Sequence, residues 1–104
     1  MNKLDGWNNR GILLLDLKQG GMLRGNVDKD HFRILIALSS IHSDKVMLSL
    51  RDYLVYGHSR RDVCNRYKLN NGYFSVSLAR LMRISQLVAL AVPYYTESHR
   101  EWSE

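Results

Sequence analysis

The stretch that decides the fold runs from Ser59 to Arg83 and reads SRRDVCNRYKLNNGYFSVSLARLMR. At its centre, Asn70-Asn71-Gly72 is a cluster that favours a turn. Around this turn, Cys64, Leu69 and Phe74 follow one another at intervals of five residues. This spacing is typical of a helix-turn-helix, in which a small residue lets two helices cross and apolar residues lock them together.

The other apolar residues of the stretch fit the same interpretation. Val63 and Tyr67 would complete the buried face of the first helix, with Cys64 as the small buried residue at the crossing, and Leu78 would anchor the second helix. Lys68 stands where a glycine is common, so we expect the turn to open differently. An ordinary helical hairpin with a short turn would show a similar apolar pattern, and the sequence leaves that alternative open.

Positive charge is concentrated in the same stretch. It holds six basic residues and one acid, Asp62, so its net charge of +5 equals that of the whole chain. The basic residues are Arg60, Arg61, Arg66, Lys68, Arg80 and Arg83. A basic face can be merely a solvated surface, but clustered on two helices that could touch DNA it predicts phosphate contacts.

The start of the second helix supplies the candidate base contacts. Residues between the apolar anchors would point outward, and the N-terminal part of such a helix usually approaches the base edges. Asparagine can bond adenine, while serine, tyrosine and backbone amides can hold phosphates. The predicted DNA-binding residues here are Asn70, Asn71, Gly72, Tyr73 and Ser75, with Val76 also facing outward. Tyr73 beside Phe74 could instead suggest a base-stacking platform for RNA.

The chain as a whole predicts an all-α fold: a small domain of four to five helices with a long last helix. One helix would begin after Asn26 or Asp28 and end near Ser39 or Ser40, and another would run from Ser43 to Gly57. The last helix would run from about Asn71 to Val92, where Pro93 should stop it. We expect an N-terminal arm over 1–25, a helical DNA-binding domain over 26–96 and a flexible tail over 97–104.

The second half of the last helix is apolar on nearly every side. Ile84, Leu87 and Leu90 lie within this part, and such a helix must be buried all round. A chain of 104 residues has few other elements to cover it. The sequence therefore predicts a homo-oligomer with these three residues at the interface. Covering by the first helix and the arm of the same chain is the alternative.

Several classes of protein are not expected. The single cysteine, Cys64, allows no intrachain disulfide, and no Cys/His cluster has metal-site spacing. Neither paired carboxylates nor a phosphate loop appear, so we expect no enzyme, cofactor, metal or small-molecule substrate. No apolar run approaches the roughly 20 residues of a membrane span, and Met1 to Arg10 lacks the apolar centre of a signal peptide. The expectation is a soluble, cytoplasmic protein without a membrane partner.

A second function class remains open on charge alone. The basic face could meet an acidic protein, which would make the chain a helical protein-interaction module. The Asn-Asn-Gly turn between two anchored helices favours DNA.

Six blocks of the sequence resemble the PapB-type family of transcriptional regulators of fimbrial and adhesin operons. They span roughly His31 to Thr96, about two thirds of the chain. The blocks are SSIHSDKV (39–46), DYLVYGHSR (52–60), VC (63–64), NNGYFS (70–75), LARL (78–81) and PYYT (93–96).

The resemblance implies a bacterial, cytoplasmic, nucleoid-associated regulator that binds AT-rich repeated DNA sites as an oligomer. It carries over Arg60, inside the GHSR block, and Asn70 to Ser75. Family members are associated with minor-groove contact, whereas a helix-turn-helix usually enters the major groove, so the groove stays open. Arginine suits a narrow AT-rich minor groove because the potential there is strongly negative.

Overall fold

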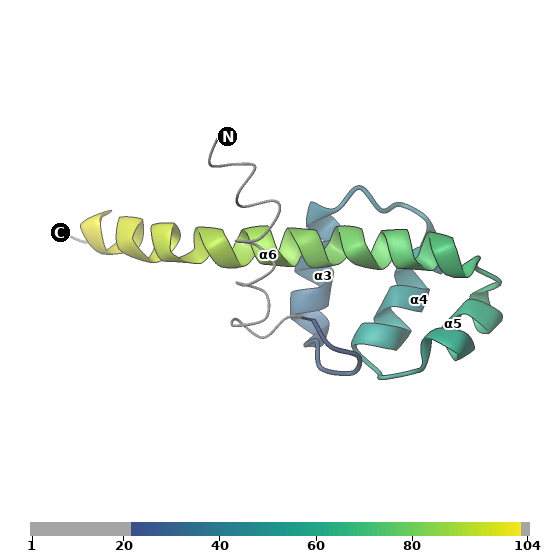
Figure 1. The fold of residues 1–104 in the computed structure, drawn as a ribbon. Helices are drawn as coiled ribbons and strands as arrows, with labels where there is room; N and C mark the ends of the chain where they lie inside the picture. The colour runs from purple at the N-terminus through teal and green to yellow at the C-terminus, as the bar shows by residue number, and fades with distance from the viewer. Residues whose placement is uncertain (1–21, 103–104) are drawn as a thin grey trace, which may run out of the picture. The chain divides into compact units, whose positions relative to one another are not determined.

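The computed structural model describes the backbone of residues 22–102 and the side chains as far as Thr96. Four α-helices make up this part of the chain, α3 (Lys29–Leu38), α4 (Asp44–Leu54), α5 (Arg60–Tyr67) and α6 (Asn71–Trp102) (Figure 1). No strand occurs among residues 22–102. The all-α class and the long last helix predicted from the sequence are confirmed. Most of the expected N-terminal arm, residues 1–21, lies outside the described residues.

Short polar side chains set the starts of the first three helices, as the sequence predicted. Asp28, Ser43 and Ser59 each have extended backbone and accept a hydrogen bond from an amide of the first turn. Such caps satisfy donors that the helix itself cannot, and each contributes about 1 kcal/mol. The bonds are Asp30 N to Asp28 Oδ1, 2.8 Å, Val46 N to Ser43 Oγ, 3.4 Å, and Asp62 N to Ser59 Oγ, 3.0 Å.

One apolar core holds the compact unit Met22–Ile84 together. Phe74 at the start of α6 is fully buried and meets Tyr53 of α4 edge to face, with ring centroids 5.4 Å apart. Figure 1 shows α4 and α5 on the same side of the N-terminal part of α6. The buried positions predicted for Val63, Leu69, Phe74 and Leu78 are confirmed. The core also includes Phe32, Leu35, Val46, Leu50, Leu54 and Leu81.

The crossing of α5 and α6 differs from the prediction at one residue. Val63 is fully buried, but Cys64 is only partly buried and lines an open pocket beside the start of α6. The prediction of a buried Cys64 is wrong because α5 turns Val63, not its neighbour, toward the core. A side chain at position 64 therefore has open space in front of it.

The turn after α5 keeps a glycine-type geometry without a glycine. Lys68 lies in the left-handed region, with φ 55° and ψ 50°, the only non-glycine residue with positive φ among those the structure describes. Leu69 N then donates to Cys64 O at 2.9 Å. The turn therefore does not open differently, as was expected with a lysine here. Lys68 instead adopts the left-handed conformation that a glycine would adopt more easily.

Pro93 does not end the last helix. α6 passes from the compact unit that ends at Ile84 into one that includes Ser85–Glu104, and it is helical as far as Trp102. The prediction of a stop at Pro93 is wrong. Proline removes a single backbone donor, at a cost of about 3 kcal/mol, and the remaining hydrogen bonds of a long helix can bridge it. Residues 103–104 lie outside the described part of the chain.

Part of α6 forms a longer apolar stretch than the sequence predicted. Within Asn71–Thr96, one window has a mean hydropathy of 1.4 and could cross a membrane by length and composition. That test alone is weak evidence, because core helices of soluble proteins also pass it. Only 11% of the window is buried. The apolar residues of this helix therefore exceed what the structure covers.

Backbone hydrogen bonds hold the segment before α3 against the end of α4. Gly25 N donates to Tyr53 O and Val27 N to Leu54 O, both at 3.0 Å. Gly25 and Gly57 both have positive φ and pack against each other, so that a Cβ at position 25 would lie 3.0 Å from the Gly57 Cα. This backbone clasp makes residues 22–25, part of the expected arm, a component of the compact unit.

Candidate nucleic-acid interface

α5, a three-residue turn and the start of α6 form the segment singled out by the sequence. Asn70 in the turn caps α6, because its Oδ1 accepts hydrogen bonds from Gly72 N at 2.7 Å and Tyr73 N at 3.2 Å. Asn70 is therefore the residue that caps this helix. Its side-chain oxygen is engaged within the protein.

The first turns of α6 present polar and apolar side chains to solvent. Tyr73 is 53% exposed and Val76 60%, while Phe74 and Leu78 of the same turns are buried. The other exposed residues at this end of the helix are Asn71, Gly72, Ser75, Ala79 and Arg80. The outward direction predicted for 71–73, 75 and 76 is thus observed, and these side chains are available to a partner.

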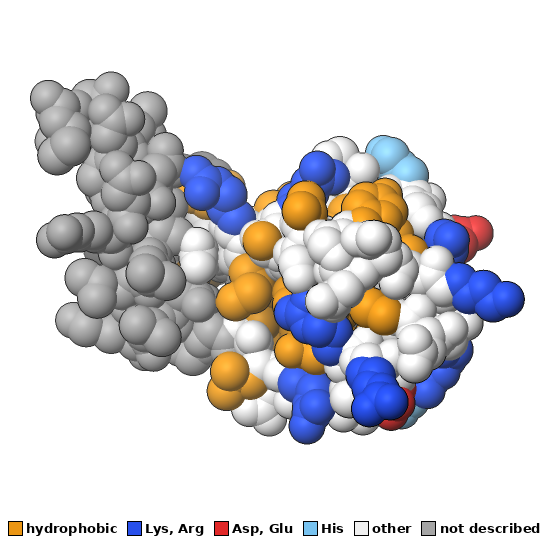
Figure 2. Space-filling model, turned by 45° about the vertical axis from the view of Figure 1, so that its right-hand side comes forward, with side chains coloured by type: hydrophobic (Ala, Val, Ile, Leu, Met, Phe, Trp, Pro, Cys, Tyr) orange, Lys and Arg blue, Asp and Glu red, His pale blue; other side chains and the backbone are white. Residues whose placement is uncertain are grey.

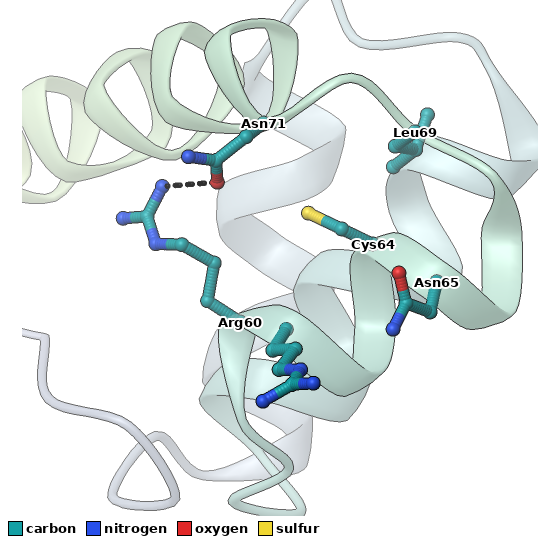
Figure 3. Close-up of a pocket in the computed structure, with 6 residues that line it drawn as sticks. Arg60, Cys64, Asn65, Leu69 and Asn71 are labelled. Carbon is teal, nitrogen blue, oxygen red and sulfur yellow. Dashed lines mark hydrogen bonds between the residues drawn. The ribbon is translucent and has the colours of Figure 1, made fainter.

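Arg60 at the first position of α5 reaches across to α6 (Figure 3). Its Nη1 donates to Ser75 Oγ at 2.5 Å and to Asn71 Oδ1 at 3.4 Å. Its guanidinium also lies over the Phe74 ring, with Cζ 5.1 Å from the centroid. The structure thus brings three of the predicted contact residues together, and Arg60 is the one that links them.

An open pocket of about 370 Å³ lies between α5 and the start of α6. Figure 3 shows the Cys64 sulfur directed into the space between Arg60 and Leu69. None of the lining residues carries a carboxylate, and two are arginines. They are Arg60, Arg61, Cys64, Asn65, Leu69 and Asn71. The chemistry of this lining suits an anionic group better than a cation.

Exposed cations surround this end of the molecule. Arg61, Lys68, Arg80 and Arg83 are all exposed. Figure 2 shows Lys and Arg side chains interleaved with apolar ones on the face that comes forward, with few acidic groups among them. A surface of this kind attracts polyanions.

Arg66 has a side chain that is 42% exposed, but its guanidinium is bonded to other groups of the protein. Its Nη1 donates to Asp52 Oδ2 and meets His58 Nδ1, each at 2.8 Å. Asp52, whose side chain is 5% exposed, also accepts from Tyr67 Oη at 2.6 Å and from Arg51 Nη2 at 2.9 Å. These five residues form a polar cluster that joins α4 to α5.

Hydrogen bonds decide the charge state of Asp52. Burial by itself would raise the pKa of the Asp52 carboxyl, but hydrogen bonds from Tyr67, Arg51 and Arg66 outweigh it and hold that pKa below its ordinary value. The hydrogen bond to Asp52 raises the pKa of the Tyr67 hydroxyl, because ionisation would place two negative charges side by side. Asp52 is therefore a structural anion.

Sequence reasoning did not find this cluster. Asp52 lies between the apolar residues Leu50 and Leu54 on the inward side of α4, where a charged residue needs a partner. A carboxylate at that position indicates a buried ion pair or hydrogen bond, and the next helix offers Arg66 and Tyr67 as partners. Among residues 22–102, no group of three or more His, Cys, Asp or Glu side chains is arranged to hold a metal.

The predicted interface residues on α6 differ in exposure. Leu87 is 45% exposed, whereas Ile84 and Leu90 are partly buried.

Known proteins resemble this chain over most of its length. The family described as adhesin biosynthesis transcription regulatory protein, PapB, matches residues 6–95. PapB of Escherichia coli, a major pilus subunit operon regulatory protein, is 51% identical over 84 residues, 81% of either chain. The AFA-III adhesin operon regulatory protein of Escherichia coli is 43% identical and covers 83% of this chain and 85% of its own.

A solved structure agrees with these relatives. The crystal structure of Escherichia coli FocB superimposes with a TM-score of 0.70 at 50% identity, covering 82% of this chain and 96% of FocB. Both the family match and the sequence identities extend through the compact unit and across α5 and the start of α6. The chain belongs to the PapB family of adhesin biosynthesis transcription regulatory proteins.

Proposed function

We propose that this transcription regulator binds double-stranded DNA with α5, the following turn and the N-terminal turns of α6. The observation that carries the proposal is the set of exposed cations Arg61, Lys68 and Arg80 around exposed polar residues of α6, beside a pocket without carboxylates. Cations on such a surface would neutralise phosphates, and the polar side chains between them would meet the sugars or base edges.

The regulated target, in this proposal, is a fimbrial or adhesin operon. Its support is the naming of the relatives, which are operon regulatory proteins for pili and adhesins. We further propose AT-rich repeated sites and a nucleoid location, as the family resemblance implies. Tyr73, 53% exposed, and Val76, 60% exposed, would supply apolar contact area at the same surface.

A gel-shift series tests the DNA-binding function. The protein is titrated into an AT-rich duplex and into a GC-rich duplex of equal length at several salt concentrations. We expect affinity to fall steeply with salt, since each neutralised phosphate contributes about 0.9 to the logarithmic slope. The AT-rich duplex should bind more tightly at every salt concentration.

The alternative, a basic face for an acidic protein, gives a different result. Such a module would bind DNA weakly and without preference between the two duplexes. An affinity for DNA that is absent, or nearly independent of salt, would contradict the proposed function.

We also propose that the chain assembles with itself through the C-terminal half of α6. The support is the apolar character of this helix, of which only 11% of the most apolar window is buried, and the 45% exposure of Leu87. Joining two or more DNA-binding units raises the effective concentration of the second unit and so favours tandem sites. Ile84, Leu87 and Leu90 are the proposed interface residues.

Sedimentation of the wild type and of the double variant Leu87→Glu, Leu90→Glu tests the assembly. The wild type should sediment as an oligomer and fill tandem sites cooperatively. The variant should be a helical monomer that still binds one site. A wild type that stays monomeric at high concentration, or a variant that unfolds, would contradict the proposal.

A further inference from the structure

We propose that Arg60 is a positioning residue, which orients Asn71 and Ser75 so that both offer hydrogen-bond donors to DNA. The inference rests on the proposed DNA-binding function and refines it. Three contacts carry it, the bonds from Arg60 Nη1 to Asn71 Oδ1 and to Ser75 Oγ, and the stacking of its guanidinium on Phe74. All three lie within the compact unit Met22–Ile84.

The chemistry of the guanidinium fixes the amide of Asn71. Arginine has five N–H donors and no acceptor, so the atom of Asn71 that faces it must be the carbonyl oxygen. The amide nitrogen, with its two donors, is then not used by Arg60 and stays available to another partner. Figure 3 shows the dashed line from Arg60 ending at Oδ1 of Asn71.

The same argument applies to Ser75. Its Oγ accepts from Arg60, so the hydroxyl proton is directed elsewhere and Ser75 also acts as an outward donor. Phe74, fully buried, holds the guanidinium from below, and Arg60 is itself only partly exposed. The donors are therefore oriented before DNA arrives, which lowers the entropy cost of binding.

A surface of donors selects its partner atoms. Phosphate oxygens, N7 of purines, O4 of thymine and the N3 and O2 atoms of A·T pairs are acceptors, whereas the amino groups of adenine and cytosine are donors. A side chain that binds adenine in two places must both donate and accept. With its oxygen turned to Arg60, Asn71 donates to one acceptor instead.

A double-mutant cycle measures whether Arg60 acts through Asn71. The variants are Arg60→Ala, Asn71→Ala and the pair, each titrated with the same AT-rich duplex. We expect each single variant to lose roughly tenfold in affinity for the duplex. The affinity of the double variant should be no lower than that of the single variant with the larger loss, because the effects of interacting residues do not add. Losses that multiply would mean independent contacts and would overturn the inference.

The salt dependence separates positioning from a phosphate contact. Arg61→Ala is the matched control, because Arg61 follows Arg60 directly in α5 and its side chain is exposed. We expect Arg61→Ala to reduce the logarithmic salt slope by about 0.9 and Arg60→Ala to leave it unchanged. A reduction by Arg60→Ala of the same size as the control overturns the positioning role.

A measurement without DNA tests the orientation itself. The side-chain amide resonances of Asn71 should shift in Arg60→Ala and stay in place in Arg61→Ala. If Arg60→Ala lowers the melting temperature too far, Arg60→Met replaces it, because its unbranched side chain still packs on Phe74. Unmoved resonances in the folded variant would overturn the inference.

The two proposals fail in different ways. A wild-type protein that does not bind DNA removes the proposed function and the inference with it. Steep, salt-dependent binding by the wild type with independent Arg60 and Asn71 losses removes the inference alone.

Discussion

The two ends of α5 use the same side chain in opposite ways. Arg60 at its start binds neutral, exposed groups of α6, Asn71 and Ser75. Arg66 near its end binds Asp52, a buried carboxylate of α4, at 2.8 Å. Loss of the first set of bonds leaves no buried charge unpaired, because all the partners reach solvent. Loss of the second would deprive a buried charge of one of its partners.

The difference shows that a count of basic residues is not a count of available cations. The stretch 59–83 has six basic residues, but Arg66 is bonded within the Asp52 cluster and Arg60 is bonded to the start of α6. The other four, Arg61, Lys68, Arg80 and Arg83, have exposed side chains. Arg66 stays a predicted DNA contact, now with a structural role beside it.

The largest effect is expected at Asp52. Asp52→Ala should lower the free energy of unfolding by about 3 kcal/mol, because it breaks a buried ion pair and leaves Tyr67 and two arginines without their acceptor. Urea denaturation measures the loss. Asp62→Ala, an exposed acid on α5, is the control and should cost less than about 1 kcal/mol. Equal losses of unfolding free energy in the two variants would mean that the Asp52 cluster stabilises the fold no more than an exposed acid does.

Acid should weaken the same cluster. The folded-state pKa of Asp52 is lowered, so its contribution to stability is complete above the unfolded pKa of about 3.9 and is lost as pH falls through the lower folded value. The free energy of unfolding should therefore decline below about pH 4. Asp52→Asn should show a shallower decline over the same range. Parallel curves for the two proteins would contradict the assignment.

Arg66 and Arg61 form a matched pair for separating stability from binding. Arg66→Ala should cost about 1–2 kcal/mol of stability, less than a fully buried hydrogen bond to a charge would, because Arg66 is 42% exposed. Arg61→Ala should change stability by less than about 0.5 kcal/mol and weaken DNA binding instead. Thermal melts and gel shifts on both variants give the comparison. The reverse pattern would exchange the roles assigned to the two arginines.

The smallest effect is a gain. Lys68→Gly should raise stability by about 1 kcal/mol, because glycine adopts a φ of 55° without the steric cost that lysine incurs. Lys68→Ala also removes the charge but keeps the steric cost, so it should show no such gain. Denaturant midpoints for the two variants decide between them. If alanine stabilises as much as glycine, the cause is charge and not backbone strain.

Local signals in the sequence predicted most of the fold. Capping residues such as Ser43 and Ser59 fix where helices start, and the spacing of Leu69, Phe74 and Leu78 fixes which faces are buried. Both depend on neighbours within a few residues. The prediction that Pro93 ends the helix was wrong because the free-energy cost of one interior proline is offset by the other hydrogen bonds of the whole helix. The residues near Pro93 alone do not show that total.

The candidate site was predicted only in outline. The sequence identified exposed residues of α6 but not which of them Arg60 contacts, because those distances depend on how α5 and α6 cross. Cys64 shows the same limit, since a rotation of α5 by one residue moves it from the core to the edge of a pocket. The Asp52 cluster joins residues fourteen positions apart, beyond the reach of helical spacing.

The backbone clasp near Gly25 has a consequence for how this chain tolerates mutation. Its hydrogen bonds come from main-chain atoms, so the neighbouring side chains Leu23 and Arg24 can change with little effect. Positions 25 and 57 cannot, because a Cβ on Gly25 would lie 3.0 Å from the opposing Cα and both residues have positive φ. In a saturation-mutagenesis library, these two glycines should stand out as intolerant sites within a permissive segment, with no side chain of their own to explain it.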